Sequence, residues 1–410
     1  MECKFCNENV GTPIFDLGDT AISNNLIGIN DLEMETKIYP LVLYVCPKCF
    51  LVQISDQIDT VEIFNDEYVY FSSTSVYWLK HAKKYCNQII KKLNLKRDSF
   101  VVEVASNDGY LLKNFVDKKI NCLGVEPTGS TAKEAILKGV PTLVDFFNVS
   151  KSHDIVQKNK KADLIIANNV LAHVPDINDF VPALKILLNL EGTITIEFPH
   201  LLCLVENKEF DTIYHEHFFY FSLYTLVNIF KKHNLCIYDL EALETHGGSL
   251  RIYATHQGND LSKVAGKLNV DKLLAKELGY KINTLEYYKK IKKDAIKIKF
   301  NSLSYLIKQK EKNKKIIAFG AAAKGNTFLN YCGIKNDIID FIVDETQFKI
   351  GKYMPQSKIP IYDFKKIIET KPDIIIILAW NHKEEILKKL LFTKKWNCNL
   401  VIFIPELKIY

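Results

Sequence analysis

The sequence predicts an α/β protein that begins with a small metal-binding domain. From residue 100 onward, short apolar segments alternate with amphipathic segments, which is the pattern of parallel sheets covered by helices. Two C-x2-C pairs stand in the first 50 residues, and a second series of strands begins near Lys315. At about 150 residues a domain, a chain of 410 residues is expected to form two to three domains.

Composition and charge exclude several classes of protein. The chain is 48% hydrophobic, 11% aromatic and 25% charged, as in globular rather than disordered or fibrous proteins. Its net charge of +6 is spread over interspersed basic and acidic residues, so we expect no nucleic-acid partner. The start shows no signal-peptide pattern, and the longest apolar run, 374–380, is too short to cross a bilayer. We therefore expect a cytoplasmic protein without a membrane partner.

The two cysteine pairs predict a structural zinc site with four ligands: Cys3, Cys6, Cys46 and Cys49. Each C-x2-C turn directs two thiolates to one side, and two such turns close a tetrahedral site with no open coordination position. The gap between the pairs is longer than in a usual zinc ribbon, so we expect an inserted strand pair at 12–15 and 38–45. Four buried thiols without metal are the alternative.

A polar-aromatic stretch at 64–75 ends this domain, and the apolar stripe of the next segment predicts a helix at 76–95. A nucleotide-binding βαβ unit then follows. Residues 100–105 read as a buried strand, 106–109 as a tight turn, and a second strand ends at Glu126. In such a unit the acid at the end of the second strand accepts hydrogen bonds from ribose hydroxyls.

The turn indicates which cofactor binds. A dinucleotide fingerprint is G-x-G-x-x-G, whereas Ala105 and Asn107 stand where glycines would be and only Gly109 remains. Glu103 and Asp108 would repel a pyrophosphate but suit the ammonium group of a methionine. The segment favours S-adenosylmethionine over NAD. The cofactor-binding residues expected here are Glu103, Ser106, Asn107, Asp108, Gly109 and Glu126.

The stretch at 211–222 concentrates ionisable groups. Tyr214, His215, Glu216 and His217 cannot all face one apolar core, and burying them unpaired would cost several kcal/mol. A catalytic pocket that works by general acid–base chemistry accounts for them. A structural hydrogen-bond network is one alternative. A metal site is another, because two histidines of an extended segment would point the same way, although no third ligand is visible.

Six motifs occur in one order along the chain. They are the double cysteine knuckle, EVASNDG at 103–109, NNVLAHVPD at 168–176, YHEH at 214–217, HGGSLR at 246–251 and GAAAKGN at 320–326. Together they resemble the nucleotide-sugar C-methyltransferases, S-adenosylmethionine-dependent enzymes of class I. That family makes branched deoxysugars such as tetronitrose and mycarose from nucleotide-linked 4-keto-6-deoxysugars. The likeness runs from the first knuckle to the last residues.

The resemblance implies three regions. These are a zinc-binding domain at 1–75, a class I (Rossmann-like) methyltransferase domain at 76–255, and a helical connector with a C-terminal Rossmann-like domain at 256–410 that holds the nucleotide sugar. The strands expected at 315–319, 338–344 and 373–379 and the glycine-led helix at 320–331 agree with the last region. The basic stretch at 263–315 would be a helical bridge with a solvated face.

The resemblance also implies positions for further cofactor contacts. In class I methyltransferases the third strand ends near an acid that meets adenine, and the fourth strand ends beside the methyl group. Asp145 and the pair Asn168 and Asn169 stand at those positions.

The implied substrate determines the chemistry. A carbon next to a ketone becomes a nucleophile when its proton is removed and the enolate oxygen is stabilised. We expect His217 to be the base, since imidazole titrates near working pH. Glu216 or Tyr214 would orient His217 or polarise the ketone. His173 would donate a hydrogen bond to the sugar from the opposite wall of the pocket. Tyr70 is added as a catalytic candidate.

The substrate-binding residues implied are Tyr68, His246, Arg251, Lys324, Gly325, Asn326, Trp380 and Asn381. Arg251 would pair with the substrate or with a carboxylate of the pocket, and Lys324 would supply charge to a diphosphate. The expected nucleotide is dTDP, with GDP or CDP as alternatives, and the expected assembly is a monomer.

The expected reaction is C-methylation at carbon 3 for branched-sugar and polysaccharide biosynthesis. Two other functions stay open. An O- or N-methyltransferase would use the base on a heteroatom of a related nucleotide sugar. A zinc-ribbon interaction protein with a degenerate methyltransferase fold would bind no S-adenosylmethionine.

Overall fold

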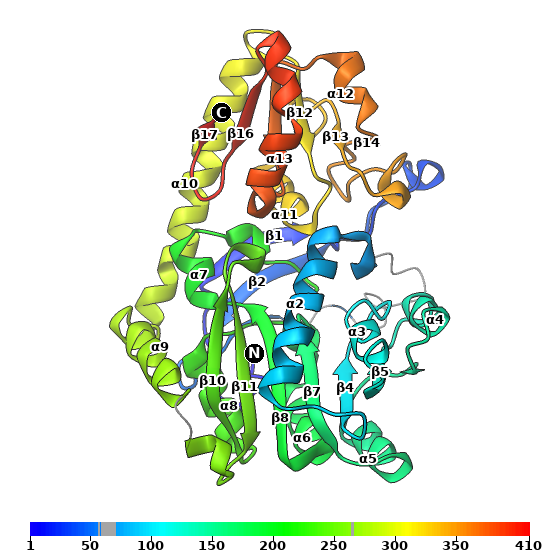
Figure 1. Ribbon diagram of the computed structural model, residues 1–410. Coiled ribbons are helices and arrows are strands. Elements are labelled where there is room, and N and C mark those ends of the chain that lie inside the picture. The colour runs from blue at the N-terminus through cyan, green and yellow to red at the C-terminus, as the bar shows by residue number, and fades with distance from the viewer. Residues whose placement is uncertain (56–57, 59–70, 264–265) are drawn as a thin grey trace.

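The computed structural model describes residues 1–55, 58, 71–263 and 266–410 (Figure 1). These residues form three sheets, and the predicted α/β class is confirmed. Tyr68 and Tyr70 lie outside the described residues. Over the described part of the chain, no helix combines the length and the apolar character needed to span a bilayer.

The first sheet has the strand order β1-β2-β3-β9. Its strands are β1 (Phe15–Thr20), β2 (Tyr39–Val45), β3 (Val52–Ile54) and β9 (Phe219–Tyr220). The expected strand at 38–45 is confirmed as β2, but its partner expected at 12–15 is wrong. The partner begins at Phe15 because Pro13 has no amide hydrogen to donate. It continues through a bulge at Gly18, whose φ is +82°.

The central sheet has the order β10-β11-β8-β7-β4-β5-β6. Its strands are β4 (Phe100–Val104), β5 (Asn121–Val125), β6 (Thr142–Leu143), β7 (Ala162–Asn168), β8 (Leu188–Pro199), β10 (Leu235–Leu243) and β11 (Ser249–His256). The α-helices of this region are α2 (Val76–Lys92), α3 (Lys113–Val116), α4 (Gly129–Leu137), α5 (Val149–Lys158), α6 (Ile177–Leu187), α7 (Leu201–Glu206) and α8 (Leu223–Lys232).

Neighbouring strands from β6 to β8 are parallel, whereas β11 is antiparallel to both β8 and β10. The doubly wound dinucleotide-binding order is 3-2-1-4-5-6. Here β11, the seventh strand of this sheet in chain order, lies between the fifth, β8, and the sixth, β10. The parallel strands β4, β5 and β7 present their carboxyl ends at one edge of the sheet, which is where open α/β sheets bind ligands.

The third sheet has the order β14-β13-β12-β15-β16-β17. Its strands are β12 (Ile316–Phe319), β13 (Ile342–Val343), β14 (Ile361–Tyr362), β15 (Ile374–Ile377), β16 (Asn399–Ile402) and β17 (Lys408–Ile409). The α-helices from residue 266 onward are α9 (Lys267–Gly279), α10 (Leu285–Lys310), α11 (Ala323–Cys332), α12 (Lys365–Thr370) and α13 (Lys383–Lys389). The strand expected at 338–344 is reduced to β13.

Helix α10 runs along one side of the molecule and joins the lower part in Figure 1 to the upper part. It contacts β1, α7 and α11, so the helical bridge expected within 263–315 is present. Its buried positions recur at helical spacing, from Tyr288 through Ile291, Ala295 and Ile298 to Leu306.

Short 3-10 helices complete the described elements. They are η1 (Ile29–Asp31), η2 (Ser72–Thr74), η3 (Leu171–His173), η4 (Phe210–Thr212), η5 (Thr245–Gly247), η6 (Asp260–Lys263), η7 (Gln347–Lys349), η8 (Trp380–His382) and η9 (Leu391–Trp396). Six of them, η2, η3, η4, η5, η7 and η8, border the site described next.

Candidate active site

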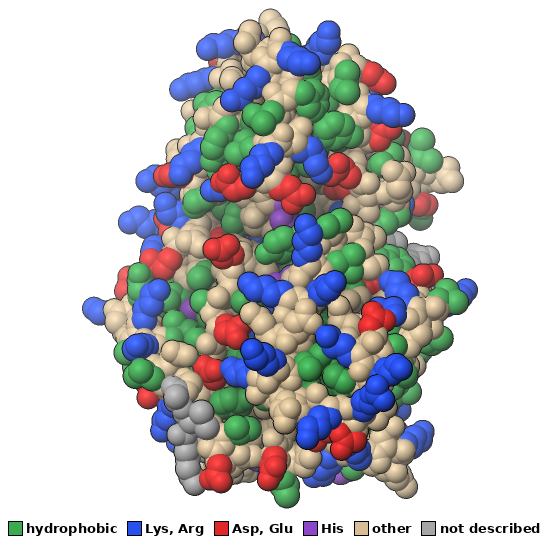
Figure 2. Space-filling model, viewed as in Figure 1, with side chains coloured by type: hydrophobic (Ala, Val, Ile, Leu, Met, Phe, Trp, Pro, Cys, Tyr) green, Lys and Arg blue, Asp and Glu red, His purple; other side chains and the backbone are tan. Residues whose placement is uncertain are grey.

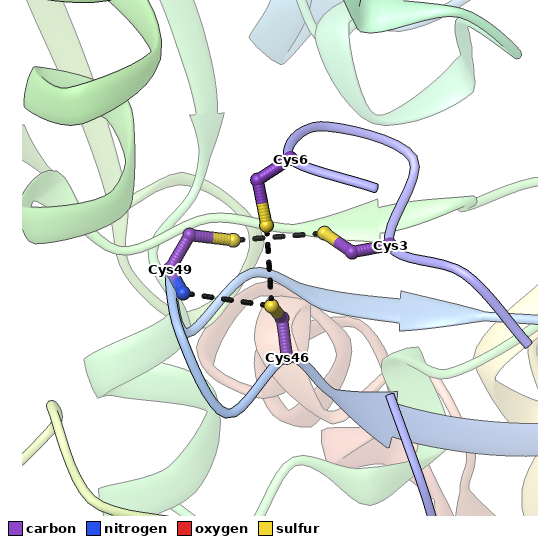
Figure 3. Close-up of side chains that lie close together, drawn as sticks. All are labelled: Cys3, Cys6, Cys46 and Cys49. Atoms are coloured by element: carbon purple, nitrogen blue, oxygen red, sulfur yellow. Dashed lines mark hydrogen bonds between the residues drawn. The ribbon is translucent and has the colours of Figure 1, made fainter. Parts of the chain in front are cut away.

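The four predicted metal ligands converge on one point, with their thiols directed toward a common centre (Figure 3). Their sulfur atoms all lie within 4.8 Å of one another. The Cys3 and Cys49 sulfurs are 3.6 Å apart, and those of Cys6 and Cys46 are 3.5 Å apart. A zinc ion about 2.3 Å from four tetrahedral sulfurs would hold them about 3.8 Å apart. The cysteine arrangement therefore fits structural zinc.

A cavity of about 560 Å³ lies where the three regions meet. Its wall combines the carboxyl ends of β4, β5 and β7, the segment 212–217, the start of α11 and η8. Histidine side chains are visible where the upper and lower parts of the molecule meet (Figure 2). The cavity has the size of a small-molecule site.

The turn after β4 borders the cavity. Its backbone has the left-handed conformation of a glycine-rich loop, although Ala105 and Asn107 stand where such a loop has glycines. Ala105, Asn107 and Gly109 all have positive φ, at +55°, +49° and +75°. Only glycine adopts this region without steric cost. A Cβ on Gly109 would lie 3.0 Å from the Val140 side chain and 3.1 Å from that of Ala135, so this position needs glycine for space as well.

Glu126 is held at the end of β5 by backbone donors. Its Oε2 accepts from the Asn107 amide at 2.8 Å, and its Oε1 accepts from the Thr128 amide at 3.0 Å. Burial raises the pKa of Glu126, and the two backbone bonds oppose that shift. The carboxyl lines the cavity and is oriented before any ligand arrives.

Asn168 ends β7, Asn169 follows it, and both line the cavity. The side-chain Oδ1 atom of each is buried and has no hydrogen-bond partner. Buried polar atoms are nearly always paired, so these two acceptors fit a ligand that brings donors. With the Glu126 carboxyl, the donor and acceptor set at this end suits the polar groups of S-adenosylmethionine.

Five of the predicted cofactor residues do not line the cavity: Glu103, Ser106, Asp108, Gly109 and Asp145. Glu103 lies beneath the turn, where burial and the neighbouring Glu126 and Asp108 raise its pKa. Asp108 bonds Lys138 at 3.0 Å, and Asp145 bonds Lys151 at 2.6 Å. The direct cofactor contacts expected of these residues stay predictions.

All four described members of the predicted catalytic group line the cavity: Tyr214, Glu216, His217 and His173. His217 donates from Nδ1 to the Thr212 carbonyl at 3.3 Å, and its Nε2 accepts from the Tyr214 hydroxyl at 3.1 Å. Burial holds the pKa of His217 well below its usual range, and positive charge on the neighbouring His173, His246 and Lys324 lowers it further. His217 is therefore a neutral ring whose Nε2 lone pair faces Tyr214.

His173 lies beside His217, with ring centroids 4.7 Å apart in an edge-to-face arrangement. Its Nδ1 donates to the Glu216 carbonyl at 2.6 Å, and burial lowers its pKa to about 4. The neutral ring then carries the lone pair at Nε2. This geometry does not support the donor role expected of His173.

The Glu216 carboxyl makes a contact that the sequence did not indicate. The amide nitrogen of Asn24 donates to both carboxyl oxygens at 2.7 Å. Burial raises the pKa of Glu216 to about 7, and the bonds from Asn24 oppose the shift. Tyr214, not Glu216, supplies the side-chain contact to His217.

His215 points away from the other members of its segment. Its Nε2 donates to the Pro40 carbonyl at 3.2 Å, and its ring meets that of Tyr39. The segment is not extended as the metal alternative requires, because the His217 amide bonds back to the Tyr214 carbonyl at 3.0 Å. Across the described ranges, the cysteine cluster is the one group with metal-ligand geometry.

At the other end of the cavity, the structure brings together His246, Lys324 and Asn381. Lys324 donates to the His246 carbonyl at 3.1 Å, and its Nζ lies 4.4 Å from the centre of the Trp380 ring. Burial lowers the pKa of Lys324, whereas Asp211 and Glu209 act to raise it.

The remaining described substrate candidates lie outside the cavity wall: Arg251, Gly325, Asn326 and Trp380. Arg251 pairs with the buried Glu197 at 2.7 Å and with Glu241 at 3.1 Å, and neither carboxylate lines the cavity. Trp380 donates from Nε1 to Asp211 at 2.7 Å. Substrate contacts by these four residues stay predictions.

Comparison with known proteins agrees with this architecture. Family models match in three places, described as a zinc binding domain over residues 3–64, a methyltransferase domain over 78–240 and a C-methyltransferase C-terminal domain over 244–405. The chain has the three domains of an S-adenosylmethionine-dependent C-methyltransferase.

A curated relative extends over nearly the whole chain. The C-methyltransferase NovU of Streptomyces niveus is 29% identical over 386 residues, which are 94% of this chain and 91% of NovU.

Solved methyltransferases resemble parts of the chain. An S-adenosylmethionine-dependent methyltransferase from Clostridium acetobutylicum is 14% identical, over 44% of this chain and 92% of its own, with a TM-score of 0.35. The magnesium protoporphyrin IX methyltransferase ChlM from Synechocystis is 16% identical, over 48% of this chain and 92% of its own, with a TM-score of 0.36.

Sequence reasoning missed several residues of the cavity wall. Asn24, Trp78, Phe146, Phe147, Lys349 and His382 line it without having been predicted. The two phenylalanines directly follow the expected adenine-side acid, so their aromatic character was an available signal. No sequence signal marked Asn24 and Lys349, because they come from segments outside every motif.

Proposed function

We propose that this C-methyltransferase acts on carbon 3 of a nucleotide-linked 4-keto-6-deoxysugar through an enolate. The observation that carries the proposal is the continuity of the cavity. One cavity is lined by Asn168 and Asn169, by the His217–Tyr214 pair, and by Lys324 with the start of α11. The three-region division at residues 75 and 255 is part of the proposal.

His217 is the base in this proposal. Its neutral ring presents the Nε2 lone pair to the Tyr214 hydroxyl. The Tyr214 oxygen can accept the proton from carbon 3 while its own proton passes to Nε2. An enolate and an imidazolium then form together, and the new positive charge lies beside the enolate. S-adenosylmethionine, when bound, supplies the electrophilic methyl group.

The other end of the cavity supports a nucleotide diphosphate. Lys324 is a buried cation there, and Ala322 and Ala323 at the beginning of α11 line the wall. Small residues at a helix N-terminus allow an anion to approach backbone amides. The methyl donor would then meet the sugar beside His217.

Deuterium exchange tests this proposal. The protein is incubated in heavy water with a dTDP-4-keto-6-deoxysugar, with and without S-adenosylmethionine, and the sugar mass is followed. Deuterium uptake next to the ketone and one added methyl on carbon are expected. Cofactor binding with methylation of oxygen or nitrogen, and no exchange, would replace the proposal with a heteroatom methyltransferase. An absence of cofactor binding would favour the interaction protein with a degenerate fold.

A further inference from the structure

Asn24 belongs to the N-terminal region, but its side chain contacts the segment 214–217, which contains the proposed base His217. It lies 192 residues before Glu216 in the sequence, and its Nδ2 is 2.7 Å from each Glu216 carboxyl oxygen. Asn24 and Glu216 both line the cavity. The N-terminal region therefore carries the cysteine site and also contributes the Asn24 side chain to the cavity.

The segment that carries Asn24 is fixed by the C-terminal region. Ile27 and Tyr353 exchange two backbone hydrogen bonds, at 3.0 and 2.9 Å. The Ala21 amide donates to Gln356 Oε1 at 3.1 Å. These contacts lie on both sides of Asn24 in the sequence. Asn24 is thus held at its place before a ligand binds.

The surroundings of Glu216 give this contact its importance. Glu216 is only 3% exposed. The titratable groups that border it are His173 on η3, which bonds its carbonyl, and Tyr214, His215 and His217 on its own segment. A buried carboxylate without donors takes up a proton.

We infer that Asn24 is a positioning residue that stabilises the carboxylate form of Glu216 and holds this side chain facing the cavity. An amide nitrogen donates hydrogen bonds, and both Glu216 oxygens receive one. A proton on either oxygen would place a donor against a donor and break one bond. The inference rests on the proposed function only for what Glu216 does during turnover; its ionisation is a property of the unliganded protein.

The test replaces Asn24 with the nearly isosteric aspartate. Asn24→Asp puts a second carboxyl against Glu216, and two adjoining carboxylates cannot both stay ionised. Asn25→Asp is the matched control, because Asn25 is the next residue and is exposed. Infrared difference spectra against Glu216→Gln give the titration of the Glu216 carboxyl in each protein, without substrate. Asn24→Ala is measured as well, in case the aspartate variant does not fold.

The expected result is an upward shift of the Glu216 titration by about one pH unit or more in both Asn24 variants and none in Asn25→Asp. In methyl transfer, the acidic limb of kcat/KM moves by the same amount, so activity lost near pH 7 returns at higher pH. Binding of S-adenosylmethionine stays unchanged. An unshifted Glu216 titration in the Asn24 variants overturns the inference. A shifted titration in a protein without sugar methylation would instead count against the proposed substrate.

Discussion

Individual ionisable side chains around the cavity are displaced toward their neutral forms. Burial raises the pKa of Glu209 to about 7 and that of Asp211 to about 6, and it lowers the pKa of His173 to about 4 and that of His246 to about 3. Groups displaced in this way cluster at functional sites. Such shifts bring the pKa values of Glu209 and Asp211 closer to neutral pH and keep the His173 and His246 rings uncharged there.

The base assignment leads to the first prediction. His217→Ala removes the Nε2 acceptor for Tyr214, so methyl transfer and deuterium exchange should fall by at least about 100-fold. Affinity for S-adenosylmethionine, measured by calorimetry, should stay within about twofold, since the cofactor end lies elsewhere in the cavity. His153→Ala, at an exposed position, is the control. A large loss of cofactor affinity in His217→Ala would contradict the assignment.

Burial of His173 predicts how stability depends on pH. Its pKa in the folded protein is about 4, below the ordinary 6.5, so the unfolded chain binds this proton first as pH falls. Its contribution to stability is complete above about pH 6.5 and is lost toward about pH 4, at up to about 1.4 kcal/mol per pH unit. His173→Gln should flatten this dependence in urea unfolding, whereas His153→Gln should not. Equal slopes in the wild type and His173→Gln would refute it.

At the scale of secondary-structure elements, two short turns determine the local architecture. The turn between β4 and α3 contains three residues with positive φ. The knuckle between β2 and β3 brings Cys46 and Cys49 to the other cysteine pair. Each turn depends on a requirement that few residue types meet: a left-handed backbone in one case and thiolates in the other.

Gly109 should tolerate no side chain. Gly109→Ala places a Cβ at positive φ and within 3.2 Å of Val140 and Ala135 atoms. Gly139 has a similar φ of +79°, but a Cβ there meets nothing within 4 Å, so Gly139→Ala isolates the backbone cost of about 1 kcal/mol. Gly109→Ala should lose more stability in urea unfolding, by about 1–3 kcal/mol, and bind S-adenosylmethionine more weakly. Equal losses of stability in the two variants would contradict this prediction, because they would mean that Val140 and Ala135 of α4 move aside for the added Cβ at no energetic cost.

The knuckles predict a link between zinc and folding. Cys46→Ser should remove the bound zinc found by metal analysis and destabilise the protein by several kcal/mol, because metal binding energy contributes to folding. Cys236→Ser changes a lone, half-buried cysteine of β10 and should keep both zinc and stability. A metal-free Cys46→Ser protein of unchanged stability and activity would disprove the zinc site.

For the whole molecule, the segment 211–218 is held by every region. Trp380 and Thr327 of the C-terminal region bond Asp211 and the Ile213 carbonyl, at 2.7 and 3.0 Å. Asn24 of the N-terminal region bonds Glu216. In the central region the Phe218 amide donates to the Ala172 carbonyl at 2.8 Å. Correct docking of the regions is thus a condition for the geometry of the segment.

Trp380→Phe tests this dependence. It removes the indole donor and leaves the buried Asp211 carboxyl without it, at an expected cost of about 1–3 kcal/mol. Methyl transfer should slow at least about tenfold, while S-adenosylmethionine still binds. Trp396→Phe also removes one indole bond, to the Pro372 carbonyl at 3.0 Å, but within the C-terminal region, and should keep kcat. Equal kcat losses in both variants would indicate a general loss of stability.

Local signals carried much of the architecture. Apolar runs predicted β4, β5, β7, β12 and β15 to within a few residues, because buried parallel strands need continuous apolar sequence. The prediction of a strand at 12–15 missed residues 16–20 of β1, because the Asp-Leu-Gly-Asp sequence there forms a bulge in the pairing with β2. All described catalytic candidates line the cavity, whereas the predicted cofactor residues Glu103 and Asp145 do not.

By itself, the sequence determined the α/β class, the cysteine site and the motifs of a methyltransferase, since each depends on neighbours in the chain or on fixed spacing. Only the tertiary structure decided that β9 completes the N-terminal sheet, that Asn24 holds Glu216, and that Trp380 bonds Asp211. These partners are far apart in sequence. No local pattern marks them, because contact between them exists only once the separate sheets have formed and packed together.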